Sequence, residues 1–217
     1  RLMENSSNIL FEAHRVDLYR DQYQVFENLN LVIKKNESVA IIGANGSGKT
    51  TLLKAINREI YPAAKENSWL KIFGKSSWDI WQLKSVLGSV SDDLYHSYSP
   101  MTKGVDVILS GFFSSIGVHG LLRSKITNRH LEEAKKVMTL LGLLALANKS
   151  LSKMSVGQQR RFLLARALVH NPKTLILDEP TTSLDLPSTF KYLKLLKKLK
   201  RRGHNFILVT HNLHEIN

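Results

Sequence analysis

The sequence predicts an α/β fold in which an antiparallel β subdomain precedes a core of parallel strands, and an α-helical subdomain is inserted into that core. Three observations support this prediction. Apolar runs rich in β-branched residues, such as 38–42 and 206–210, are typical of buried parallel strands. Residues 8–35 show partial alternation, which is typical of antiparallel strands. Residues 94–153 have helical spacing instead, which fits an insertion of helices.

Composition predicts one large domain. The chain has 217 residues, 43% of them hydrophobic, and no cysteine, which excludes disulfides, thiol chemistry and zinc fingers. No apolar run approaches the roughly 20 residues that span a bilayer, and residues 1–8 lack a secretory pattern. We therefore expect a cytoplasmic protein with a single domain over 1–217. Its expected parts are a β subdomain with the first part of the core (8–93), a helical subdomain (94–165) and the rest of the core (166–217).

The formal net charge of +13 leaves nucleic acid or an anionic membrane surface open as a partner. Much of this charge lies in residues 191–202, where leucines at helical spacing predict an amphipathic helix with lysines on its outer face. A solvated helix face explains the pattern more simply than a binding patch, because no aromatic residues interleave the lysines.

The first strands are expected at residues 9–13, 16–19, 25–26 and 29–33. Tyr19, Arg20 and Tyr23 lie between these runs, upstream of the glycine-rich loop. Their flat side chains could stack on a purine base, although surface aromatics beside a turn explain them equally well.

Residues 43–50 fit the pattern G-x-x-x-x-G-K-[ST], between a strand predicted at 38–42 and a helix predicted at 51–56. Glycines let successive backbone N–H groups point inward, and the helix N-terminus adds partial positive charge where phosphates would bind. Lys49 would reach the outer phosphates, and the Thr50 hydroxyl would help to hold Mg²⁺. The pattern predicts a P-loop nucleoside triphosphatase with these binding residues: Gly43, Ala44, Asn45, Gly46, Ser47, Gly48, Lys49, Thr50 and Thr51.

The middle of the chain predicts strands at 69–74 and 86–90, with a short helical piece at 78–83 between them. Helical spacing follows at 102–109, 128–141 and 143–147, interrupted by a loop at 111–127.

The start of the next helix carries a capping signal. Ser155 occupies an N-cap position, with Gln158 three residues on as in a capping box, and the helix that includes 162–169 ends at Asn171-Pro172. A plain helix start is the simpler interpretation of this segment alone.

Residues 174–180 predict a buried strand that ends in two carboxylates. Asp178 would bind Mg²⁺, and Glu179 would polarise the attacking water. The strand at 206–210 presents His211 at the same edge of the sheet, beside the γ-phosphate.

Taken in order, these motifs resemble the ATP-binding subunits of ABC transporters over essentially the whole chain. Residues 43–50 are similar to the Walker A loop, 175–179 to the Walker B strand and 155–158 to the signature motif. Residues 182–185 look like the D-loop, and His211 occupies the place of the switch histidine. The signature decides the resemblance, because other P-loop ATPases have Walker motifs without it. The resemblance implies a RecA-like core and Mg²⁺-dependent ATP hydrolysis.

The resemblance also implies partners. ABC subunits form a head-to-tail homodimer in which each ATP is bound by the Walker motifs of one subunit and the signature of the other. Ser155, Gly157, Gln158 and Asp185 would then contact the ATP of a second copy, while Lys49, Glu179 and His211 would be catalytic. A separate membrane permease would receive the mechanical output, placing the protein at the inner face of the membrane.

The chain departs from the family pattern at several positions. Val156 and Met154 replace the first glycine and the leucine of the signature, and Asp92 stands near the position of the Q-loop glutamine, where it could act as an oxygen ligand of Mg²⁺. Arg20, with Tyr19 adjacent, aligns with the aromatic residue that stacks on adenine. The Q-loop region and residues 110–117 look most like a subgroup related to molybdate and iron-chelate importer ATPases.

Two alternatives to a transporter ATPase remain open at this point. One is an ABC-type ATPase that has no permease and acts on nucleic acid, ribosomes or repair complexes. The translation factors of this superfamily carry two ATPase cassettes in one chain, whereas this chain carries one. The other is a nucleotide-binding regulatory module without turnover. Relatives usually continue through more strands after His211, so the resemblance implies that the last strands are missing from this chain.

Overall fold

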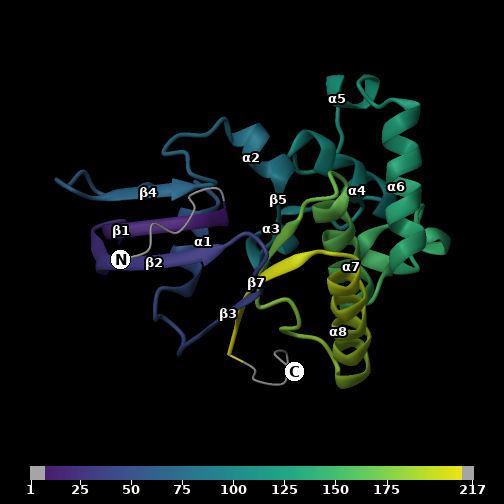
Figure 1. Cartoon of the computed structure of the whole chain (residues 1–217). Helices are drawn as coiled ribbons and strands as arrows, with labels where there is room; N and C mark the ends of the chain where they lie inside the picture. The colour runs from purple at the N-terminus through teal and green to yellow at the C-terminus, as the bar shows by residue number, and fades with distance from the viewer. Residues whose placement is uncertain (1–7, 212–217) are drawn as a thin grey trace. The chain divides into compact units, whose positions relative to one another are not determined.

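The structure, a computed structural model, describes residues 8–211 apart from the side chain of Asp92 (Figure 1). The chain forms two compact units. One comprises Arg1–Leu83 and Asn205–Asn217, and the other comprises Lys84–His204. The predicted division at residues 93 and 165 remains a prediction.

The first unit contains a three-stranded antiparallel sheet. Strands β1 (Ile9–Arg20) and β2 (Tyr23–Lys34) form a long hairpin, and β4 (Trp69–Ile72) pairs with the other edge of β1. Four short strands were predicted in the hairpin, but two long ones form, because β-bulges absorb the breaks in the apolar alternation without ending either strand. One face of β1 is fully buried through Phe11, Val16 and Leu18.

A parallel pair carries the P-loop in the same unit. Strand β3 (Val39–Ile42) pairs in parallel with β7 (Asn205–Thr210), and helix α1 (Lys49–Ile56) follows β3 after the loop. α1 buries its apolar face, with Ala55 and Ile56 fully inaccessible, and contacts β1. The strand, loop and helix lie where the sequence predicts them.

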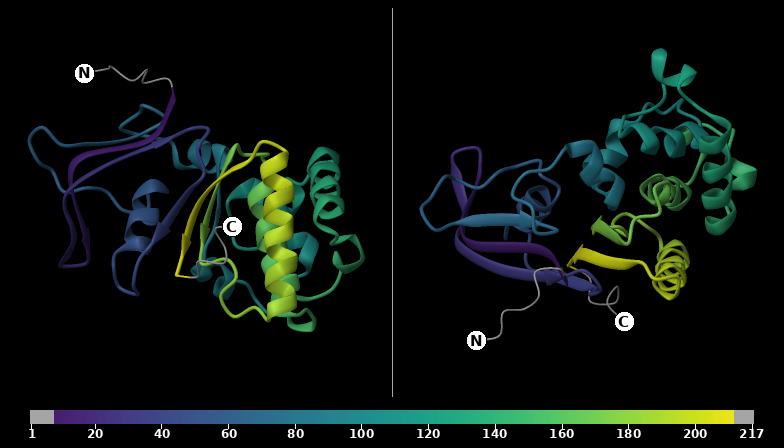
Figure 2. Two further views of the ribbon diagram at one scale, coloured as in Figure 1. Left: turned by 60° about the horizontal axis from the view of Figure 1, so that its bottom comes forward. Right: turned by 45° about the horizontal axis from the view of Figure 1, so that its top comes forward.

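In the second unit, β5 (Leu87–Val90) and β6 (Thr174–Asp178) form another parallel pair. Four of the five β6 residues are buried, as expected for a buried parallel strand. Helix α7 (Val156–Leu168) packs against β5 and against α4 (Gly104–Ser110), α6 (Asn128–Leu141) and α8 (Leu186–Arg201) (Figure 2).

Short helices complete the chain. They are α2 (Ile80–Val86), α3 (Asp92–Ser97), η2 (Gly111–Phe113), α5 (Leu121–Ser124), η3 (Leu144–Leu146) and η4 (Leu151–Lys153). The predicted loop at 111–127 thus contains two short helices, and the helical spacing at 143–147 corresponds to one 3₁₀ turn.

Helix α8 begins earlier than its lysine-rich stretch, because Asp185 caps it and Pro187 fits its first turn. Tyr192, Leu196 and Leu199 are buried, whereas the lysines are exposed, as expected for a solvated helix face.

The predicted fold class is confirmed: an antiparallel sheet, parallel strands of the P-loop core and a helical block between β5 and β6 are all present. None of the helices between residues 8 and 211 combines the length and the apolar character that crossing a bilayer requires.

Candidate nucleotide-binding site

The loop between β3 and α1 has the backbone that its glycines predict. Gly46 and Gly48 have φ of 80° and 91°, in the left-handed region that side chains disfavour. A Cβ atom at Gly48 would lie 2.6 Å from Val25 Cγ1 and 2.9 Å from the ring of Phe26. Strand β2 therefore packs directly on the loop, and only glycine fits there.

The Lys49 side chain lies over the loop formed by residues 43–48. Its ammonium group donates hydrogen bonds to the carbonyl oxygens of Gly43 and Ala44, each at 2.8 Å, and the residue is buried. Gly48 is the N-cap of α1 and offers no side-chain cap, so the positive end of the helix faces the loop. The exposed residues Ala44–Ser47 thus border an ammonium group and a helix N-terminus, an arrangement that suits a polyphosphate.

The two threonines that follow differ in accessibility. Thr50 is exposed in the first turn of α1, whereas Thr51 is 5% exposed and packs inside. A metal–phosphate complex could therefore reach the Thr50 hydroxyl but not the Thr51 hydroxyl.

The predicted base-stacking residues lie at the tip of the β1–β2 hairpin. Tyr19 is 41% exposed at the end of β1, and Arg20 pairs with the highly exposed Tyr23 across the turn. Three flat side chains therefore gather at one accessible tip, in the same unit as the P-loop.

His211 follows β7 at the edge where the P-loop follows β3. Ile42 pairs with Thr210, so Gly43 and His211 are the next residues of two parallel neighbouring strands. The sequence-based expectation that His211 shares this edge with the loop is confirmed for the backbone.

The second unit brings Asp92 and Asp178 to one sheet edge. Val90 pairs with Leu177 in parallel register, so residues 91–92 and 178–179 leave the sheet side by side. Asp92 begins α3, whose N-cap Ser91 accepts a hydrogen bond from the Leu94 N–H at 3.3 Å. Asp178 is half-buried at the end of β6.

Glu179 has a φ of 44°, so the chain turns sharply immediately after β6. The Thr182 hydroxyl donates to Glu179 Oε2 at 3.1 Å, and the Thr182 N–H donates to the Glu179 carbonyl at 3.1 Å. Sequence reasoning missed Thr182 as a partner of Glu179, although it lay within the D-loop-like segment.

The capping box at the start of α7 is confirmed. Ser155 Oγ accepts from the Gln158 N–H at 3.3 Å, and Gln158 Oε1 accepts from the Ser155 N–H at 3.1 Å. The Gln158 side chain thus orients the helix start, while the exposed Ser155 remains accessible to a ligand.

The N-termini of α7 and α8 lie side by side. A Cβ atom at Gly157 would lie 2.9 Å from Ser188 Oγ, and Asp185 Oδ1 accepts from the Ser188 N–H at 2.7 Å. Hydrogen bonds from the Ser188 side chain and backbone lower the pKa of the Asp185 carboxyl below its ordinary value of 3.8. The signature-like segment and the D-loop-like segment are therefore neighbours within one unit.

A second contact that sequence reasoning missed joins the signature helix to α3. Arg160 is almost fully buried in α7, and its guanidinium carbon lies 4.5 Å from the centre of the Tyr95 ring. No spacing rule pairs these residues, because they come from helices far apart in sequence.

The candidate residues divide between the two units. The P-loop, the hairpin tip and His211 lie in the first; Asp92, Asp178, Glu179, residues 155–158 and Asp185 lie in the second.

The sequence family described as ABC transporter matches residues 26–182, most of the chain. The chain belongs to this family. A phosphate import ATP-binding protein, PstB, of Oceanobacillus iheyensis is 28% identical over 97% of this chain and 76% of its own length. A spermidine/putrescine import ATP-binding protein, PotA, of Borrelia garinii is 33% identical over 96% of this chain, which spans only 57% of that relative.

Solved ABC transporter structures share the fold. A dimeric bacterial ABC transporter cassette superimposes with a TM-score of 0.74 at 27% identity, covering 95% of this chain and 90% of its own. A putative metal-chelate type ABC transporter in an inward-facing conformation gives 0.73 at 25% identity, covering 96% and 75%. This ABC ATPase domain therefore binds ATP and hydrolyses it to power transport.

Proposed function

We propose that this ABC ATPase powers an importer by acting on a separate permease, at the cytoplasmic face of the membrane. Three placements carry the proposal. Lys49 lies over the P-loop, Glu179 lies at the end of β6, and Ser155 caps α7. The two relatives described above are both named for import and neither for action on nucleic acid, which favours transport over the alternative.

The ATP phosphates bind to the backbone and side chains of Gly43–Thr50, with Thr51 continuing the helix behind them. Lys49 exchanges its bonds to the Gly43 and Ala44 carbonyls for bonds to the outer phosphate oxygens. Tyr19 and Arg20 contact the base, since both are accessible at the hairpin tip.

For catalysis, Glu179 orients the attacking water, and its hydrogen bond from Thr182 fixes the carboxylate. His211 contacts the γ-phosphate from the end of β7. Lys49 stabilises the charge that develops on the terminal oxygens.

We propose Thr50, Asp178 and Asp92 as oxygen ligands of Mg²⁺, because this ion prefers hard oxygen donors. Of the two whose side chains are described, Thr50 is exposed and Asp178 is half-buried. Among residues 8–211, no group of three or more acidic, histidine or cysteine side chains is placed to hold a metal ion. When bound, Mg²⁺ neutralises charge on the β- and γ-phosphates.

We further propose a head-to-tail homodimer in which Ser155, Gly157, Gln158 and Asp185 contact the ATP bound to the partner's P-loop. The exposed Ser155 and the paired N-termini of α7 and α8 support this, because helix N-termini attract phosphate. The helical subdomain, residues 94–165, would carry the signature in that arrangement.

We also propose a substrate class. Residues Ser91–Asp93 and 110–117 resemble a subgroup related to molybdate and iron-chelate importer ATPases, and the metal-chelate type transporter structure with the same fold supports such a substrate. The two relatives described above are named instead for phosphate and for spermidine/putrescine.

ATP turnover and partner capture test the function together. Glu179→Gln should retain ATP binding and lose hydrolysis, which would dismiss a regulatory module. The ATP-loaded Glu179→Gln protein should then recover a permease from membranes of the source organism. Repeated failure with folded, ATP-binding protein would contradict the transport role.

A further inference from the structure

The β1–β2 hairpin contains two bulges near its middle. The register shifts between Ala13 and Val16 and again between Val16 and Leu18. Arg15 and Asn28 have φ of 51° and 50° at these places, one on each strand. A bulge leaves its extra residue outside the ladder and bends the strand, so these two residues set the direction of the hairpin beyond them.

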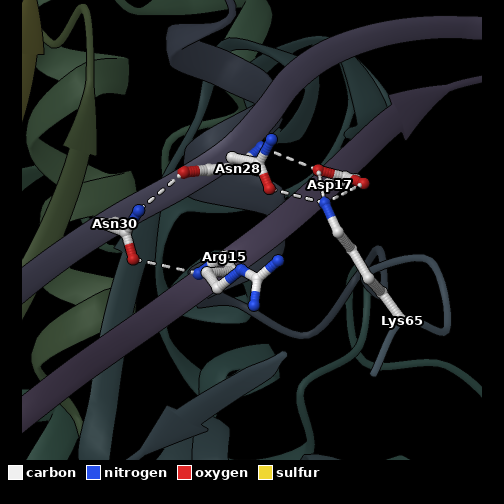
Figure 3. Close-up of polar contacts among 5 residues, drawn as sticks. All are labelled: Arg15, Asp17, Asn28, Asn30 and Lys65. Carbon is white, nitrogen blue, oxygen red and sulfur yellow. Dashed lines mark hydrogen bonds and ion pairs between the residues drawn. The ribbon is translucent and has the colours of Figure 1, made fainter. Parts of the chain in front are cut away.

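Side chains replace the ladder bonds that the bulges remove. The Arg15 N–H donates to Asn30 Oδ1 at 3.0 Å, and the Asn28 N–H donates to Asp17 Oδ1 at 2.7 Å (Figure 3). The Asn30 side-chain amide donates to the Asn28 carbonyl at 2.8 Å. The bulged backbone groups are thereby satisfied in one fixed geometry.

A third segment ties the second bulge to the region after α1. Lys65 Nζ contacts Asp17 Oδ2 at 2.9 Å and donates to Asn28 Oδ1 at 2.6 Å (Figure 3). The Ala63 N–H also donates to the Asp17 carbonyl at 3.0 Å. The side chains of Asp17 and Lys65 are only 14% and 27% exposed. We call Asp17, Asn28 and Lys65 the bulge clamp.

The bulge clamp is connected to the P-loop in two directions. Along β2, Phe26 and Val25 pack against Gly48. Along the chain, Lys65 follows α1, which starts at Lys49. All these residues belong to the same unit, and the hairpin tip with Tyr19 and Arg20 lies beyond these two bulges and a further register shift between Leu18 and Tyr19.

We propose that Asp17, Asn28 and Lys65 are positioning residues for the nucleotide base, because they fix the direction of the hairpin tip relative to the P-loop. The inference rests on the proposed function, in which the phosphates bind to the P-loop and the base meets Tyr19 and Arg20. Without the clamp, the tip pivots at the bulges and the base contact weakens. The phosphate end changes less, because its contacts come from the loop and α1 and not from the hairpin tip.

Lys65→Met in the full chain tests the proposal, with binding of Mg²⁺–ATP and of Mg²⁺–tripolyphosphate measured by calorimetry. Affinity for ATP should fall about tenfold, the size of one base-stacking contact, while affinity for tripolyphosphate stays within about twofold. Lys65→Arg should keep most of the ATP affinity. Lys136→Met, which removes the 2.7 Å ion pair with Glu133 on α6, is the matched control and should change neither affinity.

Unchanged ATP affinity in folded Lys65→Met, or an equal loss for both ligands, would overturn the inference. Asp17→Asn provides a second variant if Lys65→Met fails to fold; it keeps an acceptor for the Asn28 N–H and should shift the ratio of affinities in the same direction.

Tyr19→Ala/Arg20→Ala separates this inference from the proposed function. If this variant also leaves the ratio of ATP affinity to tripolyphosphate affinity unchanged, the proposed base site is wrong. If it lowers that ratio and Lys65→Met does not, only the role of the bulge clamp is overturned.

Discussion

The hydroxyl of Thr182 donates a hydrogen bond to the carboxylate of Glu179 at 3.1 Å. Glu179 itself has a left-handed backbone, so its side chain leaves the chain at the sharp turn that follows β6. A carboxylate on a turn has several rotamers available, and a fixed donor three residues later restricts them. Thr182 therefore selects the orientation of the residue that we assign to water activation.

Thr182→Val should lower kcat about tenfold, or about 1.4 kcal/mol in the barrier, and leave ATP affinity unchanged. The valine keeps the shape of the threonine but cannot donate to Glu179. Thr182→Ser, which retains the hydroxyl, is the control. Steady-state ATPase assays check this; a raised KM at unchanged kcat would contradict it.

Lys49→Ala should abolish Mg²⁺–ATP binding while the protein stays folded. The Lys49 ammonium bonds to two loop carbonyls, and in the proposed site it supplies positive charge to the phosphates. Lys54→Ala, on the same helix, is a control for loss of one positive charge. Calorimetric titration with ATP checks this, and retained affinity in the Lys49 variant would refute the assigned phosphate contact.

Gly157→Ala should destabilise the second unit by about 1–3 kcal/mol, because the new Cβ meets Ser188. Gly157→Ala/Ser188→Gly removes the clashing side chain and should recover most of this stability, as measured by urea unfolding. An equal loss in the double variant would show that Ser188 is not the obstacle.

Ser155→Arg should leave ATP binding by the monomer intact and prevent the ATP-driven dimer, since a bulky cation would occupy the cap that faces the partner's phosphate. Size-exclusion chromatography with ATP, in the Glu179→Gln background that prevents hydrolysis, checks this. Dimerisation at the level of the Glu179→Gln parent would count against the composite site.

Asp185→Asn should reduce the loss of stability on acidification. Because hydrogen bonds lower the folded-state pKa of Asp185 below 3.8, its stabilisation is fully present above about pH 4 and is lost as pH falls through the folded value. The asparagine keeps an acceptor for the Ser188 N–H but does not titrate. Urea midpoints at pH 7 and pH 3 should therefore differ less in this variant than in the wild type. Glu66→Gln is a control for the removal of an exposed carboxylate, and an unaltered difference in Asp185→Asn would contradict the expectation.

The sequence predicts the P-loop, β6 and the start of α7 well, because each is specified by neighbouring residues. Glycines with positive φ, a run of buried β-branched residues and a serine with glutamine three positions on are local signals. The same holds for the fold class, which follows from the order of these segments.

Contacts between distant segments could not be predicted in this way. The pairing of Lys65 with Asp17 and the packing of Arg160 on Tyr95 depend on how loops and helices meet, and no periodicity encodes either one. The bulges at Arg15 and Asn28 were missed for a related reason: a one-residue shift in register makes one continuous strand look like two short runs.

The two bulges also have a consequence for insertions and deletions in this hairpin. Ala13 pairs with Leu31 and Leu18 pairs with Phe26, so the register before the first bulge is restored after the second. Because Arg15 is the extra residue of the first bulge, deleting it would keep the pairs Ala13–Leu31 and Val16–Leu29 and leave the buried face intact. Deleting Asn28 would likewise keep Val16–Leu29 and Leu18–Phe26. A deletion at a regularly paired position would instead turn the following side chains to the opposite face, so changes in length should be tolerated at the bulges and not elsewhere in the ladder.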